Sequence, residues 1–210
     1  RFEEKSQAEK YEEMAETVRR SFVAKFWNAE RSCLFDVVSE YSKDASLRPN
    51  QIIAIALDFT MLDKEKSKKI VDAVHRELFT PFGLRTLARS DPRYHGVYMG
   101  DRRSRDAAYH NGTVWAWLQG PFITAFLKTK SYDDYKLKCA LKNLIMPLFN
   151  EQIFKAGLGN ISEIFDGDPP HLPRGCIAQA WSVAEPLRAC VEDIMQIRPK
   201  CEKEVLQDLK

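Results

Sequence analysis

The chain has 210 residues, of which 44% are hydrophobic and 30% charged, and its 32 basic and 30 acidic side chains give a net charge of +2. This composition is ordinary for a globular protein, and the balance of charge gives no reason to expect nucleic acid or an anionic membrane as a partner. No apolar run approaches the roughly 20 residues that span a bilayer, and the charged N-terminal stretch differs from a signal peptide. We therefore expect a cytoplasmic protein.

The cysteines and histidines form no metal-binding pattern. The five cysteines are odd in number and lack the close spacing of a zinc site. The four histidines show no ligand spacing, and no glycine-rich phosphate loop is present. We expect reduced thiols, no metal and no cofactor. Because the chain begins at Arg1 in a charged stretch without Met, we also expect a piece of a longer polypeptide.

Helical spacing of apolar residues predicts six helices. The first is expected over residues 9–28, where apolar side chains recur at four-residue steps. Asp63 and Ser131 are expected to cap the third and fifth helices, and Pro147 to kink the fifth. Four of the remaining five helices are expected over residues 52–58, 63–78, 132–156 and 176–195, and the other is expected to start near Asn111 or Thr113 and to run to Phe126.

Two long polar loops lie between these helices. The segment from about residue 80 to 110 sustains no period, and its tyrosines favour an ordered loop, which at this length is usually functional. Residues 159–171 hold three carboxylates and a histidine, and Gly167, Pro169 and Pro170 prevent a long helix. Polar groups on such loops commonly bind or react.

The alternation of helices and polar loops favours one all-α domain over residues 1–210, built as a toroid of helical hairpins. In that fold, inner helices surround a pocket and the loops at one end carry the chemistry. A complete toroid needs many more helices than the six predicted. An ordinary helical bundle would explain the helices equally well but would have less use for the loops.

Glu163 is the candidate catalytic residue of the second loop. Glycoside hydrolysis uses a pair of carboxylates, and one of them can act as a base on water. The alternative is structural, because an Asn followed three residues later by Glu, as in Asn160 and Glu163, often forms a capping box. The residues alone leave both interpretations open.

Aromatic and polar residues elsewhere are candidates for sugar contacts. Trp115 and Trp117 lie two residues apart and cannot share one helix face, so either one reaches a pocket or both pack in the core. His110 can bond a sugar hydroxyl or serve a structural role. Arg48 and Gln51 can form a hydroxyl-binding rim or satisfy loop carbonyls. Gln179 and Trp181 belong to the last helix, where the apolar spacing of Trp181 predicts a core residue by default.

Five motifs in this order resemble the C-terminal amylo-α-1,6-glucosidase domain of glycogen debranching enzymes, and the match covers about residues 30 to 195. The motifs are Arg48-Pro49-Asn50-Gln51, Thr80-Pro81-Phe82-Gly83-Leu84-Arg85-Thr86-Leu87, Tyr109-His110-Asn111-Gly112-Thr113-Val114-Trp115, Ile161-Ser162-Glu163-Ile164-Phe165-Asp166-Gly167 and Gln179-Ala180-Trp181-Ser182-Val183-Ala184-Glu185.

This resemblance implies an (α/α)6 toroid related to glucoamylases that hydrolyses the single glucose left at an α-1,6 branch point with inversion. It implies that Glu163 is the general base and that glycogen or a limit dextrin is the substrate. The implied substrate contacts are Arg48, Gln51, Tyr109, His110, Trp115, Asp166, Gln179 and Trp181. Of the residues on the Glu163 loop, Asp166 and His171 are better interpreted as support for the base.

The chain departs from the family pattern at two places. Ala116 stands where the family usually has a proline. The family's general acid, an aspartate, lies upstream of the matched region, and neither Asp36 nor Asp106 sits in its motif. The chain is therefore interpreted as the C-terminal half of the toroid, inactive by itself, whose partner is the missing N-terminal part of the polypeptide.

Other interpretations remain open at this point. One is a non-catalytic glucan-binding module, and another is a different toroid glycosidase such as a relative of trehalase or glucoamylase. Half a toroid also exposes an apolar seam, through which a fragment can form a dimer.

Overall fold

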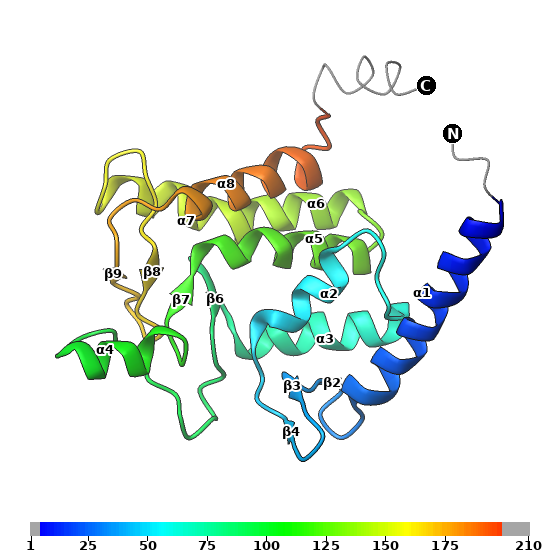
Figure 1. Cartoon of the computed structure of the whole chain (residues 1–210). Coiled ribbons are helices and arrows are strands. Elements are labelled where there is room, and N and C mark those ends of the chain that lie inside the picture. The colour runs from blue at the N-terminus through cyan, green and yellow to red at the C-terminus, as the bar shows by residue number, and fades with distance from the viewer. Residues whose placement is uncertain (1–4, 199–210) are drawn as a thin grey trace.

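A computed structural model describes residues 5–198 and shows a mainly helical chain (Figure 1). The first four helices are α1 (Lys5–Phe26), α2 (Ile53–Ala56), α3 (Lys64–Glu77) and α4 (Arg102–Tyr109). The other four are α5 (Gln119–Thr129), α6 (Asp134–Ala140), α7 (Met146–Glu151) and α8 (Ala180–Arg188). Short 3-10 turns lie at Pro49–Ile52, Ala116–Leu118 and Gln152–Phe154, and π-helical turns at Leu141–Ile145 and Ala189–Ile194.

The predicted helices are present, with different boundaries. The third is confirmed, since Asp63 caps α3 by accepting a hydrogen bond from the Lys66 backbone N–H at 2.7 Å. The cap predicted at Ser131 is wrong. Ser131 adopts a φ of 55°, and Asp133 caps α6 instead. The long fifth helix is divided into α6, a π-helical turn and α7, and Pro147 lies in the first turn of α7. The predicted kink at Pro147 stays a prediction.

Short strands occupy segments that the sequence analysis assigned to loops or helix. The strands β5 (Phe79–Thr80), β6 (Gly83–Arg85), β7 (Val114–Trp115), β8 (Ile164–Phe165) and β9 (Pro173–Arg174) form one antiparallel sheet in chain order. A helix starting at residue 113 was therefore predicted wrongly, because residues 114–115 are paired in this sheet and α5 begins only at Gln119. Two-residue strands carry no detectable period.

Two further hairpins lie near the N-terminal helix. The strands β1 (Trp27–Asn28) and β2 (Cys33–Leu34) pair with each other, as do β3 (Val37–Val38) and β4 (Lys43–Asp44). The helix α4 corrects the prediction that residues of about 80–110 form a long ordered loop without a helix. Its residues are polar around most of the helix, so the sequence has no apolar period that predicts this helix.

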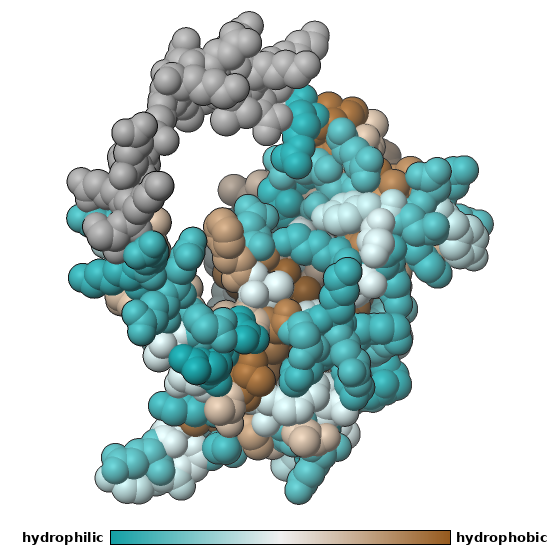
Figure 2. Space-filling view, turned by 90° about the vertical axis from the view of Figure 1, so that its right-hand side faces the viewer, coloured by the Kyte–Doolittle hydropathy of each residue, from teal (hydrophilic) through white to brown (hydrophobic). Residues whose placement is uncertain are grey.

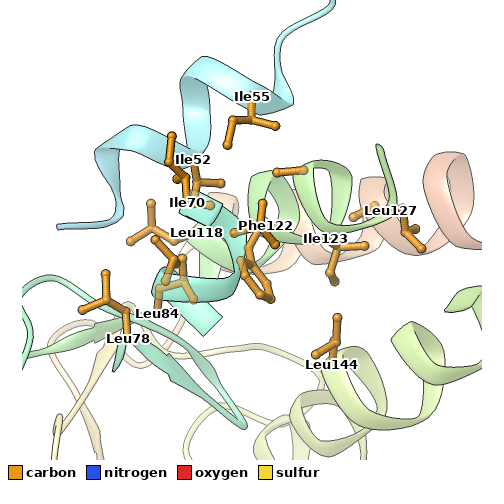
Figure 3. Close-up of a cluster of buried hydrophobic side chains, with 14 of the residues drawn as sticks. Ile52, Ile55, Ile70, Leu78, Leu84, Leu118, Phe122, Ile123, Leu127 and Leu144 are labelled. Atoms are coloured by element: carbon orange, nitrogen blue, oxygen red, sulfur yellow. The ribbon is translucent and has the colours of Figure 1, made fainter. Parts of the chain in front are cut away.

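The core is organised around α5, which packs against α2, α3, α6 and α8. Phe122 on α5 is fully buried and lies among apolar side chains of the neighbouring elements (Figure 3). These neighbours include Ile52, Ile70, Leu84 and Leu144. The sheet extends from this helical body at the end where the loops gather (Figure 1).

One side of the molecule carries unpaired apolar surface. The outer part of α1 exposes Tyr11, Met14 and Val18, whereas Phe22 and Phe26 further along the helix pack against the core. Figure 2 shows this side of the molecule, where hydrophobic residues gather in a hollow surrounded by hydrophilic ones. An exposed apolar seam is thus present, and dimer formation through it stays a prediction. Among residues 5–198, no helix is long and apolar enough to cross a membrane.

Candidate active site

An aromatic cavity of about 560 Å³ opens where the loops meet the start of α5 and α8. It brings together His110, Trp115 and Trp181, which come from two of the predicted motifs, with a third tryptophan, Trp117. Trp181 stacks on Trp117 with 5.5 Å between ring centroids and meets Trp115 edge-on at 5.9 Å. The His110 ring stacks on Trp115 at 5.5 Å. The lining residues are Asp36, Val37, Asp44, Arg48, Pro49, Asn50, Thr86, His110, Trp115, Trp117, Leu118 and Trp181.

The tryptophans of this cavity differ in how deeply they are buried. Trp115 is only 5% exposed and belongs to the core, while Trp181 is 45% exposed. The default prediction that Trp181 is a core residue is therefore wrong. It lies in the first turn of α8, where its ring reaches the cavity instead of the helix interface. Such ring faces offer apolar surface on which a sugar ring can stack.

The sheet places Glu163 beside this cavity. Strand β7 pairs with β8, and Trp115 lies opposite Ile164 in the register. Glu163 directly precedes Ile164, so the pairing brings its side chain to the residues around Trp115, almost 50 positions earlier in the chain. The capping-box alternative is not realised, because Glu163 precedes a strand and Asn160 begins no helix.

Both carboxylate oxygens of Glu163 accept hydrogen bonds. The Tyr109 hydroxyl donates to Oε1, and the Cys176 backbone N–H donates to Oε2 at 2.9 Å. Burial acts to raise the pKa of Glu163, but the hydrogen bonds from Tyr109 and Cys176 outweigh it and lower the pKa below its usual value. Glu163 is thus held as a carboxylate, which is the form that a general base requires.

Tyr109 connects Glu163 to the cavity. Its ring lies edge-on to His110 at 4.7 Å and to Trp115 at 5.0 Å. Burial, together with the hydrogen bond to Glu163, raises the pKa of Tyr109. The hydroxyl therefore stays protonated and donates to the carboxylate. Tyr109, His110, Trp115 and Glu163 form one contiguous cluster.

Arg48 reaches the cavity, although most of its guanidinium is engaged by the protein. It donates to the carbonyl oxygens of Thr86 at 3.1 Å and His110 at 2.6 Å, and to Asn111 Oδ1 at 2.9 Å. It also pairs with Asp36 at 3.6 Å. The Arg48 side chain thus satisfies loop carbonyls, which was the alternative to substrate contact in the sequence analysis.

Gln51 and Gln179 lie outside the cavity lining. The Gln51 amide is buried, accepts from the Leu34 N–H at 3.1 Å and donates to the Arg48 carbonyl at 3.0 Å. Gln179 is the N-cap of α8, and its side chain accepts from the Ala180 N–H. Both side chains hydrogen-bond to backbone groups, so Gln51 and Gln179 are not among the substrate contacts that we propose.

Asp166 supports the Glu163 loop from inside. It is buried, binds Arg174 with a shortest distance of 2.9 Å, and accepts from the Tyr98 backbone N–H at 2.8 Å. His171 Nδ1 lies 2.9 Å from the Asp166 carbonyl oxygen, and burial lowers the pKa of His171. This geometry favours the supporting role over direct substrate contact for both residues.

The cavity also contains residues that the sequence analysis did not select. The sequence left open whether Trp117 packs in the core or reaches the pocket. Asn50 lies in one of the motifs, but no role was predicted for it. Asp36, named only as a conceivable substitute acid, lines the cavity and accepts from Asn50 Nδ2 at 2.8 Å. Asp106 is exposed on α4 and lies 3.6 Å from Arg102. No cluster of three or more potential metal ligands occurs among residues 5–198.

Comparison with known proteins shows first that the fold is a toroid of helical hairpins. Neutral trehalase Nth1 from Saccharomyces cerevisiae superimposes with a TM-score of 0.59 and 16% identity, over 95% of this chain and 32% of that chain. The predicted all-α toroid is thereby confirmed as the fold.

The sequence profile of the amylo-alpha-1,6-glucosidase family matches residues 1–188, and the chain belongs to this family. The glycogen debranching enzyme of Saccharomyces cerevisiae is 36% identical over 164 residues. The match covers 68% of this chain but 10% of that protein, so the chain spans about a tenth of the length of this curated relative.

Proposed function

We propose that the complete polypeptide removes α-1,6-linked glucose from branch points of glycogen or a limit dextrin by inverting hydrolysis. The observation that carries this proposal is the carboxylate of Glu163, held ionised by two hydrogen bonds beside a cavity walled by tryptophan rings. Family membership supports a glycosidase activity of this kind. Glu163 acts as the general base that removes a proton from the attacking water.

The second carboxylate of the pair comes from outside this chain. An inverting enzyme places acid and base roughly 6.5–9.5 Å apart, on opposite faces of the sugar ring. Asp36 is engaged by Arg48 and Asn50, and Asp106 lies on an exposed helix away from the cavity lining. The missing N-terminal part of the polypeptide then supplies the acid and closes the cavity, and the present chain is inactive by itself.

The released sugar tests the stereochemistry. Proton NMR of the first glucose freed from a limit dextrin by the complete polypeptide should show the β anomer, before mutarotation mixes the anomers. Initial release of the α anomer would reject inversion. Activity of the isolated chain would reject the half-site arrangement.

Aromatic walls also suit a second candidate function, which is glucan binding without catalysis. The feature that favours it is the cavity itself, since Asp36 and Asp44 are the carboxylates among its lining residues and Glu163 lies beside this lining. A complete polypeptide that binds limit dextrin but releases no glucose would support this alternative.

A further inference from the structure

The turn after β9 contacts both the backbone and the side chain of Glu163. Gly175 follows this strand with a φ of 66°, in the left-handed region that favours glycine. The next residue, Cys176, donates its backbone N–H to Glu163 Oε2 at 2.9 Å. Its backbone carbonyl accepts from the Glu163 N–H, also at 2.9 Å. One residue of this turn therefore binds both the main chain and the carboxylate of Glu163.

Gly175 leaves no room for a side chain at this point. A Cβ there would overlap Glu163 Oε2 and would approach Ile164 Cγ1 to 3.1 Å and Glu163 Cβ to 3.2 Å. Because Ile164 is held in the sheet, the carboxylate is the group that would have to move. The absence of a side chain at residue 175 is what lets the Cys176 amide reach Oε2.

We propose that the Gly175–Cys176 turn positions the carboxylate of Glu163 to take a proton from the attacking water, an inference that rests on the function proposed above. Tyr109 holds Oε1 from one side, and the Cys176 amide holds Oε2 from the other. The Cys176 side chain also hydrogen-bonds to Glu163. With donors on both oxygens, the carboxylate plane is fixed, and an oxygen with a single donor keeps a second lone-pair direction for the water. Such preorganisation removes the cost of orienting the base during the reaction.

The first experiment measures kcat, KM and the pH profile of the complete polypeptide carrying Gly175→Ala. The added methyl group pushes the carboxylate away from the Cys176 amide, so the charged form loses a donor and the pKa of Glu163 rises. The acid limb of kcat should then move up by about one pH unit. The kcat at the optimum should fall at least about tenfold, with KM changed much less.

Gly159→Ala is the matched control. Gly159 also has a positive φ, 74°, and lies in the same loop region, but a Cβ there meets no atom within 4 Å. This variant bears the same backbone strain without touching Glu163. It should keep the wild-type acid limb and a kcat within about twofold.

A double-mutant cycle separates the contact with Glu163 from general damage to the fold. In the complete polypeptide, Gly175→Ala should lower the midpoint of thermal unfolding of this domain in the wild-type background. It should lower the midpoint clearly less when Glu163→Ala has removed the carboxylate. If Gly175→Ala fails to fold, the cycle predicts that Glu163→Ala/Gly175→Ala does fold.

The outcomes distinguish this inference from the proposed function. Gly175→Ala with wild-type kcat and acid limb, or equal losses of unfolding midpoint in both backgrounds, would overturn the positioning role while leaving the hydrolase intact. Full activity of Glu163→Gln would instead reject the proposed function on which the positioning role depends.

Discussion

At the scale of single residues, the site depends on hydrogen bonds that hold one carboxylate in its charged form. Glu163 has a lowered pKa because Tyr109 and Cys176 together outweigh the effect of burial. As a base it works when ionised, so its activity is lost as the pH falls through that pKa. Removing either donor must raise the pKa and move the loss of activity to higher pH.

Tyr109→Phe tests this relation without changing the ring. It removes the donor to Oε1, so the acid limb of kcat should rise by about one pH unit and kcat should fall about tenfold. Tyr98→Phe is the control. The centroid of the Tyr98 ring lies 5.8 Å from that of the Tyr109 ring, but the donor to Glu163 Oε1 is the Tyr109 hydroxyl and not the Tyr98 hydroxyl. Unchanged pH profiles for both variants would show that Tyr109 does not tune the base.

Trp181→Ala tests substrate stacking. Loss of the exposed ring should raise KM for limit dextrin about tenfold, equivalent to ~1.4 kcal/mol, with a smaller effect on kcat. Phe59→Ala is the control, since Phe59 is 95% exposed and does not line the cavity. Equal KM values for the two variants would remove Trp181 from the binding surface.

The sequence motifs identified most residues of this cluster but not the hydrogen bonds that connect them. The motifs marked Glu163, Tyr109, His110 and Trp115, and these residues do lie together. The motifs could not show that Cys176 binds Glu163, since that contact depends on a left-handed turn at Gly175. For Trp181, apolar spacing alone favoured the core, and only the family resemblance implied a substrate contact, because spacing does not show that the first turn of a helix opens onto a cavity.

At the scale of elements, helices were predictable where one face is apolar. The helix α3 has such a face and a capping Asp63, and it was placed within one residue at each end. The five-stranded sheet was missed because strands of two or three residues have no period to detect. Its pairing nevertheless joins the segments at residues 80, 114 and 164, and so fixes where Glu163 lies.

Packing around α5 should dominate the stability of this framework. Phe122→Ala removes a fully buried ring and should lower the free energy of unfolding by about 3–5 kcal/mol. Phe154→Ala, at a site 67% exposed, should change it by less than about 1 kcal/mol. Denaturant unfolding of the domain measures both, and similar losses would show that α5 is not the centre of the core.

At the scale of the whole molecule, the described chain is an open part of a toroid. It covers 32% of the trehalase chain that shares its fold, and apolar residues of α1 remain exposed. Joining the rest of the polypeptide would cover such surface. Sequence motifs identified the family, but the exposed faces became visible only once the helices were placed.

The central claim is that Glu163 is the general base, and the most direct test is the rate of glucose release from a limit dextrin by the complete polypeptide carrying Glu163→Gln. The amide keeps the size of the side chain but cannot take a proton from water. We expect kcat to fall at least about a thousandfold, or ~4 kcal/mol of transition-state stabilisation, with binding retained. A kcat within about tenfold of the unmodified enzyme would contradict the claim.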